Sequence, residues 1–340
     1  MTMSSEQLIP TLDISSFTGA ADANSLAIAR EVNKACEEIG FLVIEGHGVP
    51  GQIIEKLDAC SRQFFDLPLE TKQSYFASDD TYFGYKGMQH AALAYSLDIE
   101  DAKPDLREQF GSGRPDYPEL TDDYYRKGMG LEFRCDIRWP QEVVDFQVAW
   151  ADYYNAMADL SEKIMRIFAV ALDMPLDYFD RMLDKHVSSL GVYNYPEQKD
   201  KPEEGQLRGG AHTDFGSLTI VHADWSAPGG LQVFTKNREW MGVPAKPGTF
   251  AINIGDMMER WTNDRWVSTL HRVANPPGNY AGNTRRQSII FFHIPNYDAI
   301  VECIPSCADS ENPAKYDPIT VGNHHLMKMG KMFDVEDEPG

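Results

Sequence analysis

Residues 209–216 read Gly-Gly-Ala-His-Thr-Asp-Phe-Gly, and the apolar run 218–221 follows them closely. His212 and Asp214 lie two positions apart between these turn-forming glycines. Residues at i and i+2 of a β-strand point to the same face, so one strand end can direct an imidazole and a carboxylate at a single point. Later in the chain, His271 supplies a candidate third ligand. We therefore predict a metal site built from His212, Asp214 and His271.

Two histidines and one carboxylate on one face of a metal ion, with the other positions open, are the ligand set of non-haem Fe(II) oxygenases. An isolated His-x-Asp tripeptide is a weak signal because it is common by chance. A zinc hydrolase could use the same ligand types. However, no Glu lies beside the three residues in the His-Glu-x-x-His pattern of metalloproteases. An Fe(II) oxygenase is therefore our working hypothesis.

Composition limits the other functional classes. The chain has 340 residues, an apolar content of 42% and a formal charge of −21 at pH 7. This negative charge argues against nucleic acid and against anionic membranes as partners, because phosphate contacts need clustered Lys and Arg. No apolar run approaches the ~20 residues that span a bilayer. The first residues lack the basic start and apolar core of a secretion signal, so we expect a cytoplasmic protein.

The apolar pattern changes along the chain. Helical spacing of apolar residues predicts helices over about 23–40, 53–65 and 140–172, and a last helix around 326–332. After Val187, short apolar runs alternate with turns, which is typical of a sandwich or jelly roll. We expect one catalytic unit: an N-terminal helical and mixed region (1–180), a β core (181–300), and a C-terminal helix with an acidic tail (301–340). The expected strands contain 190–193, 218–221, 230–234, 240–243, 250–254 and 288–293.

The region 77–140 is rich in Gly, Pro, Asp and aromatic residues, as functional loops often are. Within it, we expect 82–85 and 108–111 to be loop segments that carry exposed aromatic side chains. The candidates for an aromatic substrate wall, with ordinary packing as the alternative for each, are Tyr82, Phe83, Phe110, Phe234 and Trp240. Three arginines could meet an acidic substrate, although surface arginines are common: Arg107, Arg114 and Arg285.

Several motifs, taken together and in order, resemble the isopenicillin N synthase-like branch of the Fe(II)/2-oxoglutarate-dependent dioxygenases. The resemblance extends from Ile9 to about Met332. It begins with an N-terminal block, 40–49, that reads Gly-Phe-Leu-Val-Ile-Glu-Gly-His-Gly-Val, and with 64–68, Phe-Phe-Asp-Leu-Pro. In the core, the matching motifs are 211–214 (Ala-His-Thr-Asp), 253–256 (Asn-Ile-Gly-Asp), 268–273 (Ser-Thr-Leu-His-Arg-Val) and 286–288 (Arg-Gln-Ser).

The resemblance implies a double-stranded β-helix of the cupin-like, jelly-roll type that holds Fe(II) through the two histidines and Asp214. It also implies that Arg286 and Ser288 bind the distal carboxylate of 2-oxoglutarate and that Tyr195 reaches the same group. A guanidinium fork matches a carboxylate, and a hydroxyl adds one donor. Tyr193 stands where many relatives have Asn near the metal, which leaves its role open. The implied reaction uses O2 and converts 2-oxoglutarate to succinate and CO2.

Three further histidines need an interpretation. His293 lies at an odd offset from both Arg286 and Ser288, so a regular strand turns it to the opposite face, and we favour a packing role. His324 and His325 lie on the expected terminal helix, and we predict that both are at the surface.

The primary function predicted is hydroxylation or desaturation of a small molecule by a 2-oxoglutarate-dependent dioxygenase. An alternative in the same fold is an Fe(II) oxidase of the isopenicillin N synthase type, which uses the Arg-x-Ser motif on another carboxylate. From a different class, a non-catalytic ligand-binding jelly roll is disfavoured by the intact ligand set. A related branch makes ethylene from 2-oxoglutarate, and 291–296 resembles it weakly. The sequence determines neither the primary substrate nor the oligomeric state.

Overall fold

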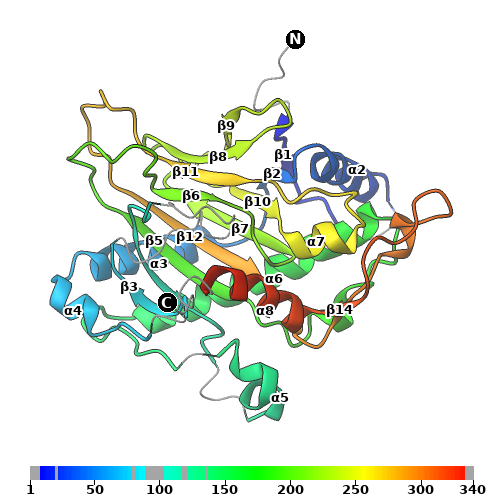
Figure 1. Cartoon of the computed structure of the whole chain (residues 1–340), viewed down its shortest axis with the longest axis horizontal. Coiled ribbons are helices and arrows are strands. Elements are labelled where there is room, and N and C mark those ends of the chain that lie inside the picture. The colour runs from blue at the N-terminus through cyan, green and yellow to red at the C-terminus, as the bar shows by residue number, and fades with distance from the viewer. Residues whose placement is uncertain are drawn as a thin grey trace, which may run out of the picture.

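The structure is a computed structural model. It describes residues 8–19, 22–78, 81–88, 103–116, 121–134 and 136–333, without the side chains of 330–333. Figure 1 shows strands at the centre, with the long helix α6 behind them and α8 in front of the sheet. The described helices are α2 (Ala23–Glu38), α3 (Gly51–Phe65), α4 (Leu69–Gln73), α5 (Asp123–Arg126), α6 (Phe146–Ala171), α7 (Asp256–Trp261) and α8 (Val321–Phe333).

The strands form a large sheet, a smaller one and a short hairpin. The large sheet has eight strands in the order β1 (Thr11–Asp13), β2 (Phe41–Glu45), β10 (Phe250–Ile254), β7 (Leu218–Ala223), β12 (Arg286–His293), β5 (Ser189–Tyr195), β4 (Glu108–Ser112) and β3 (Gly84–Lys86). The second sheet has the order β6 (Gly209–His212), β11 (His271–Ala274), β8 (Gly230–Phe234) and β9 (Trp240–Gly242). The hairpin pairs β13 (Ile300–Val301) with β14 (Ile319–Thr320).

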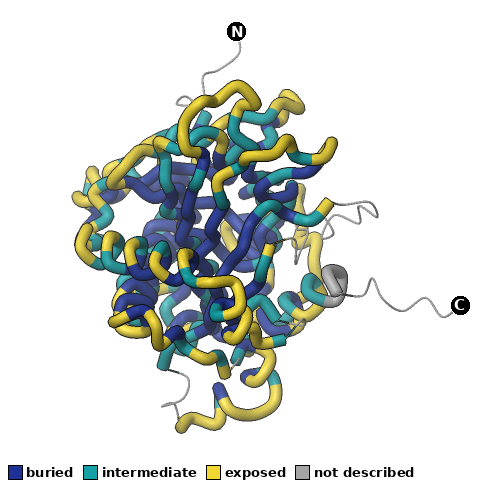
Figure 2. The backbone as a smooth tube through the Cα atoms, turned by 90° about the vertical axis from the view of Figure 1, so that its left-hand side faces the viewer, coloured by how far each residue is buried: buried dark blue, intermediate teal, exposed yellow. Residues whose placement is uncertain are grey.

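These sheets form the jelly-roll core that the strand pattern predicted, and the N-terminal region extends it at both edges. Strands β1 and β2 pair onto β10 at one edge, while β3 and β4 pair onto β5 at the other. The predicted strands are present within about two residues of their expected limits. Figure 2 shows the buried strands enclosed by exposed outer loops and helix surfaces.

Alternation along β12 separates the cavity from the main core. Ile289 and Phe291 are fully buried in the core, and Phe291 meets the ring of Tyr154 on α6 at 5.2 Å between centroids. The even-numbered residues of the strand face the other way, into a cavity. This two-residue period is the expected pattern of a strand with different environments on its two faces. None of the helices described combines the length and apolar character needed to cross a lipid bilayer.

Two local predictions were wrong. Helix α6 begins at Phe146 rather than at Pro140, because Asp145 adopts left-handed backbone with φ of 62° and interrupts the helix there. The segments 82–85 and 108–111, predicted as exposed loops, overlap β3 and coincide with most of β4, and both strands are buried along their whole length. Their burial depends on Glu108, whose carboxylate accepts hydrogen bonds from Lys72 (2.7 Å) and from the hydroxyl of Tyr85 (2.6 Å).

Candidate metal centre and cofactor pocket

The predicted metal ligands meet where the ends of β6 and β11 lie side by side. His212 is directly opposite His271 in the antiparallel register, and their ring centroids are 4.3 Å apart. Asp214 lies in the turn just after β6, and its carboxylate oxygens are 3.7 Å from Nε2 of each histidine. One ligand atom from each residue can be chosen so that all three lie within 4.8 Å of one another. This cluster has the right donors and spacing for a metal ion.

Backbone carbonyls orient both imidazoles. Nδ1 of His212 donates to the carbonyl oxygen of Gly210 at 2.9 Å, and Nδ1 of His271 donates to that of Thr269 at 3.0 Å. These bonds leave each Nε2 as the lone-pair atom facing Asp214. Burial, and secondly the neighbouring His271, lowers the pKa of His212 to about 3, so this ring is neutral at pH 7. The Nε2 lone pair of His212 is therefore available to coordinate a cation.

The carboxylate of Asp214 is held by two further side chains. Its Oδ2 accepts hydrogen bonds of 2.6 Å from the Thr219 hydroxyl on β7 and from the Asn253 amide on β10. Burial by itself would raise the pKa of this carboxyl, but the two imidazoles and these hydrogen bonds lower it below its ordinary value. Asp214 is therefore ionised and fixed in direction, as a metal ligand must be.

The turn that carries Asp214 is packed too closely for side chains at two glycines. A Cβ on Gly216 would lie 2.5 Å from the carbonyl oxygen of His293, and one on Gly255 would lie 2.2 Å from that of Gly216. The backbone N–H of Asp256 also donates to the carbonyl oxygen of Asp214 at 2.7 Å. The glycines let β12, this turn and the start of α7 approach one another, which positions the carboxylate.

A second polar cluster lies across β12 and β5. Arg286 is opposite Tyr195 in the register, and Ser288 is opposite Tyr193. The guanidinium carbon of Arg286 lies 5.1 Å from the centroid of the Tyr195 ring, and the Tyr195 and Ser288 hydroxyls are 3.3 Å apart. Nη1 of Arg286 is buried without a hydrogen-bond partner in the described part of the chain. A buried guanidinium in this state is a cradle for a carboxylate.

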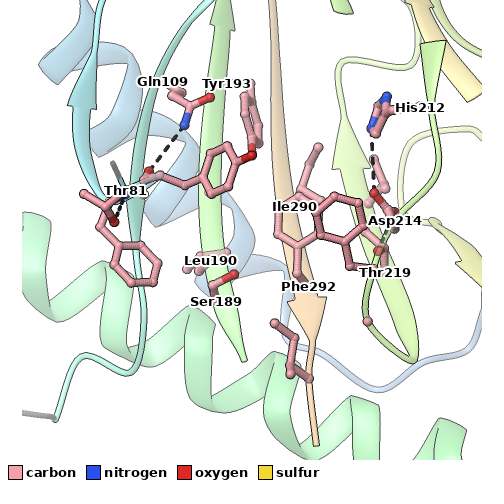
Figure 3. Close-up of a pocket in the computed structure, with 18 of the residues that line it drawn as sticks. Thr81, Gln109, Ser189, Leu190, Tyr193, His212, Asp214, Thr219, Ile290 and Phe292 are labelled. Carbon is pink, nitrogen blue, oxygen red and sulfur yellow. Dashed lines mark hydrogen bonds and ion pairs between the residues drawn. The ribbon is translucent and has the colours of Figure 1, made fainter. Parts of the chain in front are cut away.

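A cavity of about 400 Å³ contains both clusters. Figure 3 shows Gln109 and Tyr193 on one side of it and His212 with Asp214 on the other, with Ile290 and Phe292 of β12 between them. Strands of the two sheets supply much of the wall, and residues 81–83, 131–134, 213–216 and α8 add to it. The cavity therefore has room for a small organic molecule beside the metal and carboxylate clusters.

The structure separates the predicted substrate residues into two groups. Tyr82 and Phe83 line the cavity. Phe110 does not, since it is fully buried on the other face of β4, where it meets Phe64 and Trp150. Phe234 and Trp240 are also outside the cavity wall, because they pack on each other at the β8–β9 hairpin, with 5.0 Å between ring centroids.

Tyr193 and the remaining histidines also have defined positions. Tyr193 lines the cavity, where burial raises the pKa of its hydroxyl to about 12. His293 lies on the opposite face of β12, as its odd offset predicted, and its Nδ1 is 2.7 Å from the Ser217 hydroxyl. The prediction that His324 and His325 are at the surface was wrong: His324 is buried, and His325 lines the cavity. Helix α8 folds back over the cavity and brings His325 into its wall.

The sequence interpretation missed several cavity residues. Ile290 and Phe292 continue the alternation that begins at Arg286, so strand parity could have identified both. Phe215 follows Asp214 in the turn after β6, where strand parity does not apply. Met329 comes from α8 and could not be placed without the long-range packing of that helix. Of the three arginines proposed to meet an acidic substrate, Arg107 alone lines the cavity. Arg114 is bound to Asp116 and Arg285 to Asp66.

Comparison with known proteins agrees with this geometry. Residues 187–295 match the family model of the 2OG-Fe(II) oxygenase superfamily, and residues 9–142 match the N-terminal model described as non-haem dioxygenase in morphine synthesis. The chain belongs to the 2OG-Fe(II) oxygenase superfamily, in its isopenicillin N synthase-like branch. It is a 2-oxoglutarate-dependent oxygenase, and its cofactor and co-substrates are Fe(II), 2-oxoglutarate and O2.

Individual relatives are similar over nearly the whole chain. Homoarginine-6-hydroxylase 2-ODD-233 of Oryza sativa subsp. japonica is 32% identical over 94% of this chain and 96% of its own length. The 2-oxoglutarate-Fe(II) type oxidoreductase hxnY of Emericella nidulans is 32% identical over 92% and 86%. A full-length protein of Neurospora crassa, crystallised in complex with alpha-KG, superposes with a TM-score of 0.79 and 28% identity, over 95% of this chain and 96% of that one.

Proposed function

We propose that His212, Asp214 and His271 hold the Fe(II) ion and that the protein hydroxylates or desaturates a small organic substrate. The observation that carries this proposal is the three-residue cluster, whose ligand atoms lie within 4.8 Å of one another in the wall of the cavity. Two further crystal structures of the Neurospora crassa protein support the small-molecule class, since one contains thymine and the other 5-formyluracil.

The donor set fits Fe(II). Imidazole nitrogen and carboxylate oxygen are ligands that suit iron, and three of them leave positions free for other molecules. The bound ion supplies the activation of O2 and the oxidative decarboxylation of 2-oxoglutarate to succinate and CO2. The protein's own part is to fix the ligands, which the carbonyls of Gly210 and Thr269 do for the imidazoles, as Thr219 does for the carboxylate.

We assign the distal carboxylate of 2-oxoglutarate to Arg286, Ser288 and Tyr195. The buried, unpartnered Nη1 of Arg286 supplies a donor, and the two hydroxyls beside it supply more. A second guanidinium, that of Arg208, is buried near the first, and burial followed by the charge of Arg286 lowers its pKa to about 10. Two buried cations close together favour an anion between or beside them. The relative hxnY is named as a 2-oxoglutarate-Fe(II) type oxidoreductase, and the Neurospora crassa protein was crystallised with alpha-KG, which favours this assignment over a 2-oxoglutarate-independent oxidase.

We also propose that the chain acts as one catalytic unit. Residues from each of the three expected segments line the same cavity: Tyr82 and Arg107 from 1–180, the two clusters from 181–300, and His325 from 301–340. The N-terminal and C-terminal segments therefore close the space around the substrate and exclude water from it. This role explains why the resemblance covers the whole chain and not the β core alone.

The experiment is an anaerobic titration followed by visible absorption. The protein is loaded with Fe(II), and the spectrum is recorded before and after addition of 2-oxoglutarate. We expect a new charge-transfer band in the wild type and a large loss of this band in Arg286→Ala. Arg285→Ala is the matched control, because the Arg285 guanidinium is bound to Asp66 and lies outside the cavity wall.

Each outcome has a consequence. If the Arg286→Ala protein keeps the wild-type band at the same 2-oxoglutarate concentration, the carboxylate assignment is wrong. If the wild type binds Fe(II) without a band, 2-oxoglutarate does not chelate the metal here. If it binds no Fe(II), the assignment of the three ligands fails.

A further inference from the structure

Arg107 is a buried arginine in the cavity wall for which the proposed function provides no role. It lies just before β4, and its exposed fraction is 8%. Arg107, Gln109 and Gly111 line the cavity, while the alternate residues Glu108 and Phe110 face the core. Strand geometry therefore places the Arg107 side chain on the cavity side of the sheet.

The other buried charged side chains of the cavity wall already have a role in the proposed function. Among the described lining residues, the buried carboxylates and guanidiniums are those of Asp214, Arg286 and Arg107. Asp214 serves the metal, and Arg286 serves 2-oxoglutarate, under the proposed function. A buried charge is costly unless it is paired or binds a ligand, and Arg107 has a buried partner in Asp105. What this pair does in the cavity wall is not explained by the metal or the co-substrate.

The residues around Arg107 hold its position and use only part of its donor capacity. Its guanidinium carbon lies 4.4 Å from the centroid of the Tyr193 ring, and its Nε is 3.4 Å from Oδ2 of Asp105. The other oxygen of Asp105 accepts the backbone N–H of Gly210 at 2.8 Å. The guanidinium also hydrogen-bonds the Tyr193 hydroxyl. Because a guanidinium carries five N–H donors in a planar fork, these contacts to Asp105 and Tyr193 fix the group and leave further donors for a ligand in the cavity.

Arg107 and Arg286 lie in the same row of the sheet but on different strands. Arg286 is opposite Tyr195, and Glu108 is opposite Asn194, so Arg107 is on the far side of Tyr195 from Arg286. Two strand spacings separate their backbones by roughly 10 Å. This separation of the backbones leaves room for the co-substrate at Arg286 and for the substrate at Arg107.

Flat apolar side chains make up much of the wall between these charges. The Phe and Tyr residues that line it in the described part of the chain are Tyr82, Phe83, Phe133, Tyr193, Tyr195, Phe215 and Phe292. Such a wall accommodates an aromatic body by stacking and edge contacts. A guanidinium fork at one end binds a carboxylate through two parallel hydrogen bonds. The carboxylate of Asp105 nearby disfavours a ligand with two negative charges, such as a phosphate monoester.

We infer that Arg107 binds the carboxylate of the primary substrate and that this substrate is a small aromatic monocarboxylic acid. The inference rests on the proposed function, since it takes the metal and Arg286 as already occupied. Gln109, next on the same strand face, donates its Nε2 to the Tyr82 carbonyl oxygen at 3.3 Å and so helps to hold the wall beside the bound acid. Arg107 thereby determines specificity in the reaction of the enzyme.

The test compares acids with their amides. Benzoate, phenylacetate and phenylpropionate, and the amide of each, are titrated into the anaerobic protein loaded with Fe(II) and 2-oxoglutarate, and binding is measured by calorimetry. We expect at least one acid to bind about tenfold or more tightly than its amide, since charge-assisted hydrogen bonds are the stronger kind. Arg107→Gln removes this preference, and Arg107→Lys keeps part of it, because an ammonium retains the charge but not the fork.

Arg134→Gln is the competing variant, because Arg134 also lines the cavity and is bound to Asp136 at 2.9 Å. The inference is wrong if no acid binds more tightly than its amide, if the preference persists in Arg107→Gln, or if Arg134→Gln removes it instead.

The charge-transfer band of bound 2-oxoglutarate is recorded for each protein. Loss of this band in both Arg107 variants, with unchanged thermal unfolding, would assign Arg107 to the co-substrate instead. A wild type without the band would overturn the proposed function, while the acid preference would still decide the role of Arg107.

Discussion

His212 lies directly opposite His271 across the antiparallel pair of β6 and β11, with 4.3 Å between their ring centroids. The register of two short strands therefore determines the spacing of two residues that are far apart in the sequence. Because each ring is also held through Nδ1 by the carbonyl two residues before it, both Nε2 atoms face Asp214 without any further adjustment. The metal cluster is thus a product of backbone pairing more than of side-chain packing.

Removal of one imidazole should empty this cluster. In His271→Gln, we expect the Fe(II) content to fall to background and 2-oxoglutarate turnover to fall more than about 100-fold, since even changes to the groups that support metal ligands cost 10–100-fold. The measurements are iron content after anaerobic loading and succinate release. His47→Gln is the control, because His47 lies in a turn where it contacts the Gly248 carbonyl and is outside the cavity wall. Wild-type iron content in His271→Gln would contradict the ligand assignment.

The backbone of β12 lies so close to Gly216 that one added methyl group should disturb the metal site. In Gly216→Ala, the new Cβ would meet the His293 carbonyl oxygen at 2.5 Å, so the turn that carries Asp214 has to move. We expect a loss of about 1–3 kcal/mol in the free energy of unfolding and of about 10–100-fold in Fe(II) affinity. Metal titration and urea unfolding measure the two effects. Gly242→Ala, which has no heavy atom within 4 Å of the new Cβ, should change neither; equal effects in both variants would contradict the argument.

The sequence carried enough information to predict the parts of the site that depend on local spacing. His212 and Asp214, like Arg286 and Ser288, are pairs at i and i+2, and strand alternation brings each pair to one face. The same alternation correctly placed His293 on the opposite face. Apolar runs between turns predicted the core strands for the same reason.

The other parts of the site could not be predicted from local spacing, because they depend on long-range packing. The side chains of Arg107 and Phe110 point to opposite faces of the sheet, as an offset of three residues requires in a strand. This could be predicted only if 108–112 was known to be a strand. No apolar run marks this strand, because its burial comes from Lys72 and Asn194 binding Glu108. His325 reaches the cavity through the path of α8 across the molecule, which no local pattern encodes.

A partly buried, neutral histidine, His186, should make the stability of the protein fall in mild acid. Burial, and secondly the positive charge of Arg114, lowers the pKa of His186 to about 4. An unfolded histidine titrates near 6.5, so between about pH 6.5 and 4 the unfolded chain binds more protons than the folded one, and stability falls with falling pH. His186 alone contributes a slope of at most about 1.4 kcal/mol per pH unit in this window.

In His186→Gln, we expect this part of the slope to disappear, while the hydrogen bond to the Ser188 hydroxyl (2.9 Å in the wild type) can be retained by the amide. Urea unfolding at several pH values between about 7 and 5 measures the slope, and above about pH 7 the two proteins should show parallel behaviour. An unchanged slope below pH 6.5 would mean that His186 is protonated in the folded protein.

The buried ion pair beneath β4 should be far more important for stability than exposed pairs are. Lys72 and Glu108 are 2.7 Å apart with side-chain exposures of 10% and 5%, and the same carboxylate group binds Tyr85 and Asn194. Glu108→Gln keeps the volume but leaves the Lys72 ammonium buried without its counter-charge, so we expect a loss of about 3–5 kcal/mol in the free energy of unfolding.

Asp123→Asn is the matched control, because it removes the carboxylate of an exposed pair, whose Lys127 partner lies 2.8 Å away with side-chain exposures of 72% for the lysine and 71% for the aspartate. Solvent screens that pair, so little change is expected. Urea unfolding of both variants gives the comparison. Because β4 carries Gln109 and follows Arg107, Glu108→Gln should also weaken binding of aromatic acids, while leaving Fe(II) content unchanged. Equal stabilities of the Glu108→Gln and Asp123→Asn proteins would show that β4 is not anchored through this carboxylate.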